Sequence, residues 1–164
     1  MATHAPVRAA LLGSGLFATG AYLPSLKGVT NLTINTVWSR SEKSARNLET
    51  KAQELGFPAF DTQFGPEGLD AVLANKDIDA VILVLPITAQ PDIIRRAWKA
   101  GKHVLSEKPL GRDIAEAKAL VDEYEKEYKP KGLVWRVAES ECVVDAAMDA
   151  AMDGGESVSA PCHP

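Results

Sequence analysis

A carboxylate and an ammonium stand together in Glu107-Lys108-Pro109, directly after the apolar run Val104-Leu105. In an open parallel sheet, ligands bind in the crevice beyond the carboxyl ends of the strands. A Glu-Lys pair placed at such a strand end is where chemistry would be done. Pro109 fixes its own φ and restricts Lys108, so the pair is held in place. Lys108 is therefore the candidate catalytic residue of this sequence, and Glu107 and Lys108 are also candidate ligand contacts.

A glycine-rich turn near the N-terminus predicts what that ligand is. The stretch 13–18, Gly-Ser-Gly-Leu-Phe-Ala, fits the pattern G-x-G-x-x-[G/A], with an apolar run before it and a helical stretch after it. The first glycine permits a tight turn, the second lets the backbone approach a pyrophosphate, and the small third residue allows close helix–strand packing. An ordinary tight turn is the alternative interpretation. The candidate cofactor-binding residues of this turn are Gly13, Ser14, Gly15, Leu16 and Phe17.

The end of the second predicted strand bears on the choice between NAD and NADP. Sites that prefer NAD place an acidic residue there to bind the ribose 2′-OH, whereas sites for NADP accommodate the 2′-phosphate with an arginine. This chain has Ser39 and Arg40 at that point, with no carboxylate before Glu42. The pattern favours NADP over NAD. The alternative is that Arg40 only faces solvent at the start of a helix.

The loop after the most apolar run of the chain, residues 80–85, borders the same edge of the predicted sheet. It begins with Pro86, a further candidate cofactor contact, and reaches Gln90 four residues later. Gln90 has two interpretations of equal weight. It donates a hydrogen bond to a ligand, or it caps the helix that follows.

Bulk properties bound the class of protein. The 164 residues suffice for one domain of ordinary size, and a hydrophobic content of 46% with 24% charged residues is typical of a globular protein. The net charge of -4 argues against a nucleic-acid binder, and the absence of an apolar run of about 20 residues argues against a membrane span. Cys142 and Cys162 match no metal-ligand spacing. These features predict a cytoplasmic protein without a metal site, a nucleic-acid partner or a membrane partner.

Alternating strand and helix patterns predict the architecture. Strands are expected at 7–12, 32–38, 59–60, 80–85, 103–106 and 132–138, with helical patterns between them. This order is typical of an α/β protein with a Rossmann-type, doubly wound parallel sheet in three layers. The composition changes near Cys142, where a four-residue Asp-Ala-Ala-Met unit repeats. We therefore predict a nucleotide-binding domain over 1–140 and a tail over 141–164 that is partly helical and partly irregular or disordered.

With these motifs in place, the chain resembles the Gfo/Idh/MocA family of NAD(P)-dependent oxidoreductases. Three blocks match the family in order: 11–15 onward, 85–88 and 100–109, the last of which is highly specific. The resemblance extends from about Val7 to Glu139. It implies a Rossmann domain and, in complete members, a second domain that forms much of the substrate pocket.

The resemblance also implies an activity. In the family, the lysine at the position of Lys108 lies beside the nicotinamide and assists proton transfer while hydride moves between the cofactor and a sugar or polyol carbon. Partial burial suits a lysine to this role because it lowers the pKa of an ammonium toward neutrality. The position of Glu107 supports the cofactor ribose or orients Lys108. Many members have a histidine where this chain has Gln90.

The second domain of the family has no counterpart after Ser140 in this sequence. We interpret the tail as the product of an early stop, altered splicing or a wrong gene model, with a genuine short paralogue as the alternative. A sugar or polyol substrate is then expected only where a second domain is supplied. Two other functions remain open: a dinucleotide-binding module without catalysis, and a Rossmann domain for another ligand such as S-adenosylmethionine, against which Arg40 and the Glu107-Lys108-Pro109 block argue.

We expect the purified chain alone to show negligible turnover. Positioning a second reactant accounts for much of an enzyme's rate, and the expected domain contributes only the cofactor side. The measurement is oxidation of a panel of sugars and polyols with NADP⁺, followed by absorbance. Turnover at ordinary enzyme rates of about 1–1000 s⁻¹ would contradict this expectation.

Overall fold

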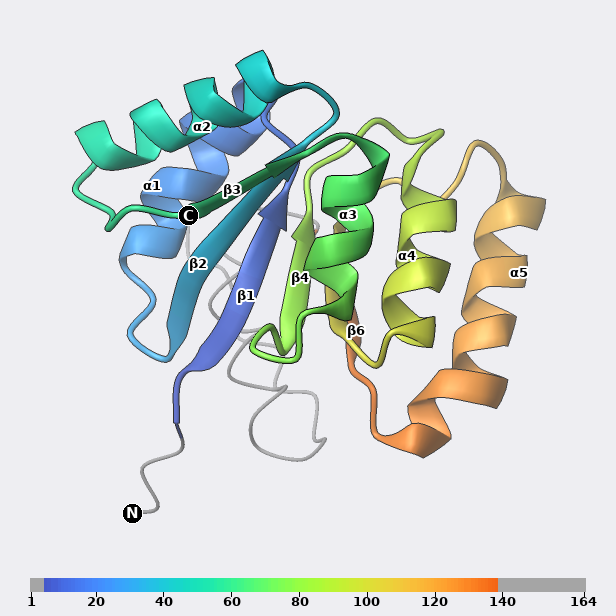
Figure 1. Ribbon diagram of the computed structural model, residues 1–164. Coiled ribbons are helices and arrows are strands. Elements are labelled where there is room, and N and C mark those ends of the chain that lie inside the picture. The colour runs from blue at the N-terminus through green and yellow to red at the C-terminus, as the bar shows by residue number, and fades with distance from the viewer. Residues whose placement is uncertain (1–4, 139–164) are drawn as a thin grey trace, which may run out of the picture.

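A computed structural model describes residues 5–138 of the chain, which form a six-stranded parallel sheet with helices on both faces (Figure 1). The predicted tail, 141–164, lies outside the described residues. The strands are Val7–Leu12 (β1), Leu32–Ser39 (β2), Asp61–Phe64 (β3), Ala80–Leu83 (β4), His103–Glu107 (β5) and Trp135–Ala138 (β6).

Helical segments alternate with these strands along the described chain. They are Ala18–Tyr22 (η1), Leu23–Lys27 (α1), Glu42–Glu54 (α2), Gly65–Ala74 (α3), Gln90–Lys99 (α4), Ile114–Glu123 (α5), Tyr124–Tyr128 (η2) and Lys129–Lys131 (η3). Segments η1 and η2 have π-helical geometry and η3 is a 3₁₀ turn.

The order of the strands in the sheet is β3-β2-β1-β4-β5-β6, and every neighbouring pair is parallel. This arrangement confirms the predicted Rossmann-type, doubly wound fold. The order in which strands are added to the sheet reverses between β1 and β4. Strands β2 and β3 lie on one side of β1, and β4, β5 and β6 lie on the other. The crevice beyond the carboxyl ends of β1 and β4 is where such folds bind their ligands.

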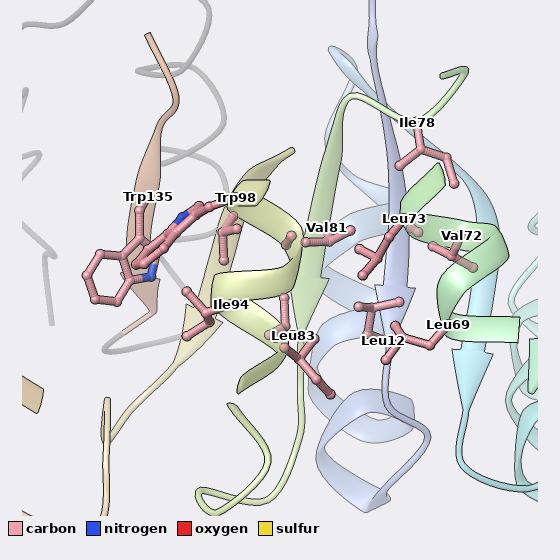
Figure 2. Packing of buried hydrophobic residues seen from close by; sticks show 14 of the residues in the cluster. Leu12, Leu69, Val72, Leu73, Ile78, Val81, Leu83, Ile94, Trp98 and Trp135 are labelled. Carbon is pink, nitrogen blue, oxygen red and sulfur yellow. The ribbon is translucent and has the colours of Figure 1, made fainter. Parts of the chain in front are cut away.

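Alternation along the central strands builds two separate cores, one on each face. Leu11 and Ile82 lie in the core beneath α1 and α2, whereas Leu12 and Leu83 lie in the core beneath α3 and α4. Figure 2 shows Leu12 and Leu83 among the side chains of this second core. Both faces of β1 and β4 are therefore buried, as a central parallel strand requires.

An aromatic cluster attaches α5 and β6 to the second core. The Trp98 ring lies 5.0 Å from that of Tyr128 and 5.1 Å from that of Trp135, measured between centroids. Trp98 and Trp135 lie side by side in Figure 2. Offset and edge-on pairs of this kind add about 0.5–1.5 kcal/mol each beyond the area they bury. The cluster therefore packs β6 and η2 against α4.

The helical stretch after the glycine-rich turn runs through Pro24 to Lys27. Pro24 has no N–H to donate to the preceding turn. The wider π turn at Ala18–Tyr22 comes directly before it, and the Leu23 N–H donates to Ala18 O five residues back. The irregular turn thus accommodates the proline without ending the helix.

Several strand boundaries differ from the sequence prediction, including that of β4, which ends at Leu83 and not at residue 85. The third strand is Asp61–Phe64 and not 59–60, because it is a partly exposed edge strand whose polar residues give no hydrophobic signal. The last strand begins at Trp135 and not at Gly132, which ends η3 with a φ of 80°. Strands β2 and β5 each extend one residue beyond the prediction, so Ser39 and Glu107 belong to the sheet itself.

The amino edge of the sheet, opposite the ligand crevice, is stabilised by polar contacts. Buried Lys102 donates through Nζ to the carbonyl oxygens of Asn75 and Ile78, at 2.6 and 2.7 Å. The Arg8 guanidinium pairs with Asp79 at 3.1 Å. These contacts fix the loop that leads into β4. None of the helices formed by residues 5–138 has both the length and the hydrophobicity needed to cross a bilayer.

His103 at the start of β5 gives the fold a pH dependence. Its Nδ1 accepts a hydrogen bond from the Val134 N–H at 3.0 Å, so that nitrogen is unprotonated in the folded chain. Burial lowers the pKa of His103, an effect that nearby Asp79 partly opposes. Because the folded pKa lies below the unfolded value of about 6.5, the unfolded chain binds the proton first as the pH falls.

We therefore expect His103 to contribute stability that is present above about pH 6.5 and lost as the pH falls through its folded pKa. The substitution His103→Gln retains an acceptor for Val134 but does not titrate. Urea unfolding of both chains between pH 7 and 5 measures the difference. The wild type should lose more unfolding free energy over this interval than His103→Gln, and parallel curves would contradict the assignment.

Candidate dinucleotide site

The predicted site residues come from four strand ends that share one edge of the sheet. Gly13 to Phe17 follow β1, and Pro86 comes after β4. Ser39 is the last residue of β2 and is followed by Arg40, and Glu107 is the last residue of β5 and is followed by Lys108. Because all the strands are parallel, these ends lie on the same side of the molecule, toward which β1 and β4 point in Figure 1. The topology therefore brings together residues that are up to about 95 positions apart in sequence.

Gly13 is required by the protein's own backbone. Its φ is 120°, and a Cβ at this position would lie 2.1 Å from the carbonyl oxygen of Val84, just beyond β4. The Gly13 N–H donates to Trp38 O at 2.9 Å, which joins the turn to β2 as well. Gly13 thus lets the turn pass between the ends of β2 and β4, the two strands that flank β1.

Gly15 differs from Gly13, because a Cβ there would meet nothing within 4 Å. The protein's packing does not explain this glycine, whereas a closely approaching ligand would. Leu16 is 93% exposed, and Phe17 is exposed beside it. Ala18 is fully buried, as expected for the small third residue that packs the helix against the sheet.

Ser14 and Ser39 link the glycine-rich turn to the end of β2. Their hydroxyl oxygens lie 2.7 Å apart, within hydrogen-bond distance. Arg40 follows and is exposed, with no hydrogen bond or ion pair to the residues that the structure describes. Ser41 caps α2 by accepting from the Ser44 N–H at 3.3 Å. The guanidinium of Arg40 is thus available to a ligand, while its two serine neighbours are engaged with the protein.

The loop after β4 contributes an exposed Pro86 and, at the start of α4, a buried Gln90. The Gln90 side chain is only 1% exposed, and neither amide atom has a hydrogen-bond partner among residues 5–138. It does not cap α4, whose N-cap is Ala89 without a side-chain hydrogen bond. The capping interpretation of Gln90 is therefore wrong. The alternative interpretation, in which Gln90 donates a hydrogen bond to a ligand, calls for an exposed amide, and the amide of Gln90 is buried.

Glu107 is held from two directions. Its Oε1 accepts a hydrogen bond from the Tyr22 hydroxyl, and its Oε2 accepts from the Lys108 N–H at 3.2 Å. Burial, followed by the hydrogen bond to Glu107, raises the pKa of Tyr22 well above its usual range. Tyr22 is therefore a protonated donor to Glu107 at neutral pH.

Lys108 itself is exposed, so residues 5–138 do not supply the partial burial expected for a proton-transferring lysine. Its peptide bond to Pro109 is cis. Across residues 5–138, no three His, Cys, Asp or Glu side chains gather closely enough to hold a metal ion.

Tyr22 is the site residue that sequence reasoning missed. It lies 85 positions from Glu107, and no local pattern in the sequence joins the two. The available signal was a tyrosine seven residues after Gly15 in a helix that packs on the sheet. Buried tyrosines usually find a hydrogen-bond partner, so an acceptor for this hydroxyl was to be expected.

Comparison with known proteins places this site in a family. Residues 7–131 match the GFO_IDH_MocA model, described as an oxidoreductase family with an NAD-binding Rossmann fold. The chain belongs to this family, and the described residues are its NAD(P)-binding Rossmann domain.

Curated and solved relatives agree. The chain is 42% identical over 132 residues to the dehydrogenase FPY6 of Fusarium mangiferae, covering 80% of this chain and 37% of that protein. It is 34% identical to a dTDP-3,4-didehydro-2,6-dideoxy-α-D-glucose 3-reductase of Streptomyces violaceoruber, covering 71% of this chain and 31% of that protein.

Among solved structures, the fold matches KijD10, a 3-ketoreductase from Actinomadura kijaniata crystallised with NADP. The TM-score is 0.63 at 28% identity, covering 80% of this chain and 38% of KijD10. This chain thus spans about a third of the length of the relatives it matches.

The two glycines of the turn form a matched pair of substitutions. Gly13→Ala should destabilise the fold by about 2 kcal/mol or more, because its Cβ meets the Val84 carbonyl in a conformation that disfavours side chains. Gly15→Ala should leave the unfolding free energy unchanged and weaken dinucleotide binding by about tenfold or more, through the methyl in the ligand's space.

Chemical denaturation and a dinucleotide titration of both variants test this division. If Gly15→Ala lost as much unfolding free energy as Gly13→Ala, protein packing and not a ligand would explain the glycine at position 15. If Gly15→Ala bound as tightly as the wild type, the ligand would not approach this part of the turn.

Proposed function

We propose that this chain binds NADP in preference to NAD and is the cofactor domain of an oxidoreductase that transfers hydride to or from a sugar or polyol carbon. The carrying observation is Arg40, an exposed cation at the end of β2 where no carboxylate is present. A guanidinium can grip a 2′-phosphate through two parallel hydrogen bonds, whereas a carboxylate would repel it. The neighbouring Ser14 and Ser39 side chains are small and neutral, and they hydrogen-bond to each other.

The described residues fit a dinucleotide along the whole edge. The open space at Gly15 would accommodate a pyrophosphate, and the backbone N–H groups of the turn that leads into η1 would donate to it. Leu16 and Phe17 offer exposed apolar surface beside the turn, and Pro86 borders the crevice from β4. NADP in the crystal of KijD10, a relative with the same fold, supports this choice of cofactor.

The reaction we propose follows from Glu107 and Lys108. When bound, the nicotinamide supplies the acceptor or donor of hydride. Lys108 would take the hydroxyl proton of an alcohol as it is oxidised, or return a proton to the carbonyl oxygen in the reverse direction. Glu107 would fix the Lys108 backbone through the Lys108 N–H. A sugar as substrate is supported by the relatives named as sugar 3-reductases.

Arg40→Ala tests the cofactor preference. We expect this variant to bind NADP⁺ about 10- to 100-fold more weakly than the wild type and NAD⁺ equally well, because only the 2′-phosphate contacts the guanidinium. Isothermal titration with each dinucleotide gives the affinities. Arg46→Ala is the matched control, since Arg46 is an exposed arginine of α2 whose partner is Glu42 at 2.8 Å.

Arg46→Ala should retain the wild-type affinity for both dinucleotides. An equal loss in the two arginine variants would indicate a general effect of charge and not a contact of Arg40. Tighter binding of NAD⁺ than of NADP⁺ by the wild type would overturn the preference itself.

A further inference from the structure

Two segments that border the proposed cofactor are joined by a single side chain, Tyr22. It lies in η1, the continuation of the glycine-rich turn, and its hydroxyl donates to Glu107 at the end of β5. These segments meet only because the sheet places the helix after β1 over the strands β4 and β5. The contact therefore connects the dinucleotide turn to the loop that carries Lys108.

The Glu107 carboxylate is shared between the two sides of this connection. One oxygen accepts from Tyr22, and the other accepts from the backbone N–H of Lys108 at 3.2 Å. The Glu107 backbone is itself held in the sheet, opposite Ala138 of β6. Fixing the carboxylate therefore fixes the direction of the Lys108 peptide, from which the lysine side chain begins.

The Tyr22 ring is well placed to transmit a change at the turn. It is buried in the first core, which also contains Leu105 of β5, and makes an edge-on contact with Phe17 at 5.6 Å between centroids. Phe17 is half exposed and lies two residues after Gly15. A ligand that orders the turn would thus act on Phe17, then on Tyr22, and through Glu107 on Lys108.

Packing alone does not account for the hydroxyl. A phenylalanine would fill the same space in the core, and a buried hydroxyl is costly unless it is hydrogen-bonded. The hydroxyl instead bonds a carboxylate at the reacting edge, which makes the interaction charge-assisted and stronger than a neutral one. The position and partner of this group indicate a role in the site.

We propose that Tyr22 is a positioning residue, which holds the Lys108 backbone through Glu107 and couples it to the occupancy of the dinucleotide turn. The coupling to ligand rests on the proposed function, whereas the hold on Lys108 is a property of the chain without ligand. The two parts can therefore be tested separately.

The first test measures amide hydrogen exchange by NMR in the full chain without ligand. Tyr22→Phe should accelerate exchange of the Lys108 N–H by about tenfold, because the Glu107 carboxylate that accepts from it is released. Core amides of β4 and β5 should exchange at wild-type rates. Tyr128→Phe is the matched control, since Tyr128 is equally buried but its hydroxyl makes no hydrogen bond to residues 5–138.

The double variant Tyr22→Phe/Glu107→Ala refines this test. Since both changes break the same connection, Lys108 exchange in the double variant should match that in Glu107→Ala alone. An unchanged Lys108 rate in Tyr22→Phe, or acceleration spread evenly over the sheet, would overturn the positioning role. Additive effects of the two substitutions would also overturn it.

The second test measures NADPH binding and the emission of the bound nicotinamide. Tyr22→Phe should bind about threefold or more weakly and shift this emission, whereas Tyr128→Phe should match the wild type. Identical binding and emission for Tyr22→Phe and the wild type would overturn the coupling. Failure of the wild type to bind NADPH would instead overturn the proposed function, and the exchange test would still decide the hold on Lys108.

Discussion

The site depends on a backbone contact between the Gly13 turn and the end of β4. A Cβ on Gly13 would approach the Val84 carbonyl to 2.1 Å, so no side chain can stand between these two segments. The Gly13 N–H also bonds Trp38 O, so the turn is tied to β2 on its other side. This contact sets where the turn leaves the sheet and how the following helix is directed. The positions of residues 15–17, which we propose to face the ligand, therefore depend on this contact between Gly13 and the end of β4.

The two cores explain why this geometry is firm. Central strands β1 and β4 bury side chains on both faces, and the aromatic cluster around Trp98 holds β5 and β6 against the second core. A parallel sheet of this kind offers its polar backbone ends only at its edges. The amino edge is closed by Lys102 and the Arg8–Asp79 pair, which leaves the carboxyl edge as the open one. The groups that we propose to bind a ligand thus lie on one side of the molecule.

Much of this arrangement was predictable, because parallel strands place their carboxyl ends together once their order is known. The glycine pattern, Arg40 and the Glu107-Lys108 block each follow a predicted strand, and this placed them at one edge without any coordinates. The third strand was misplaced because Asp61–Phe64 is partly exposed and lacks a hydrophobic pattern. The contacts Ser14–Ser39 and Tyr22–Glu107 were not predictable, because each joins side chains from separate elements whose rotamers depend on packing.

The Glu107-Lys108-Pro109 block identifies the family of this chain more firmly than it identifies an activity, and the same geometry explains why. Its backbone is fixed by Glu107 from within the sheet, yet the Lys108 side chain is exposed and takes no burial from residues 5–138. Enclosure of the Lys108 side chain, whether by bound dinucleotide, substrate or further protein, is therefore not a property of residues 5–138. What these residues supply is the direction in which the lysine leaves the sheet, through the Lys108 N–H that donates to Glu107.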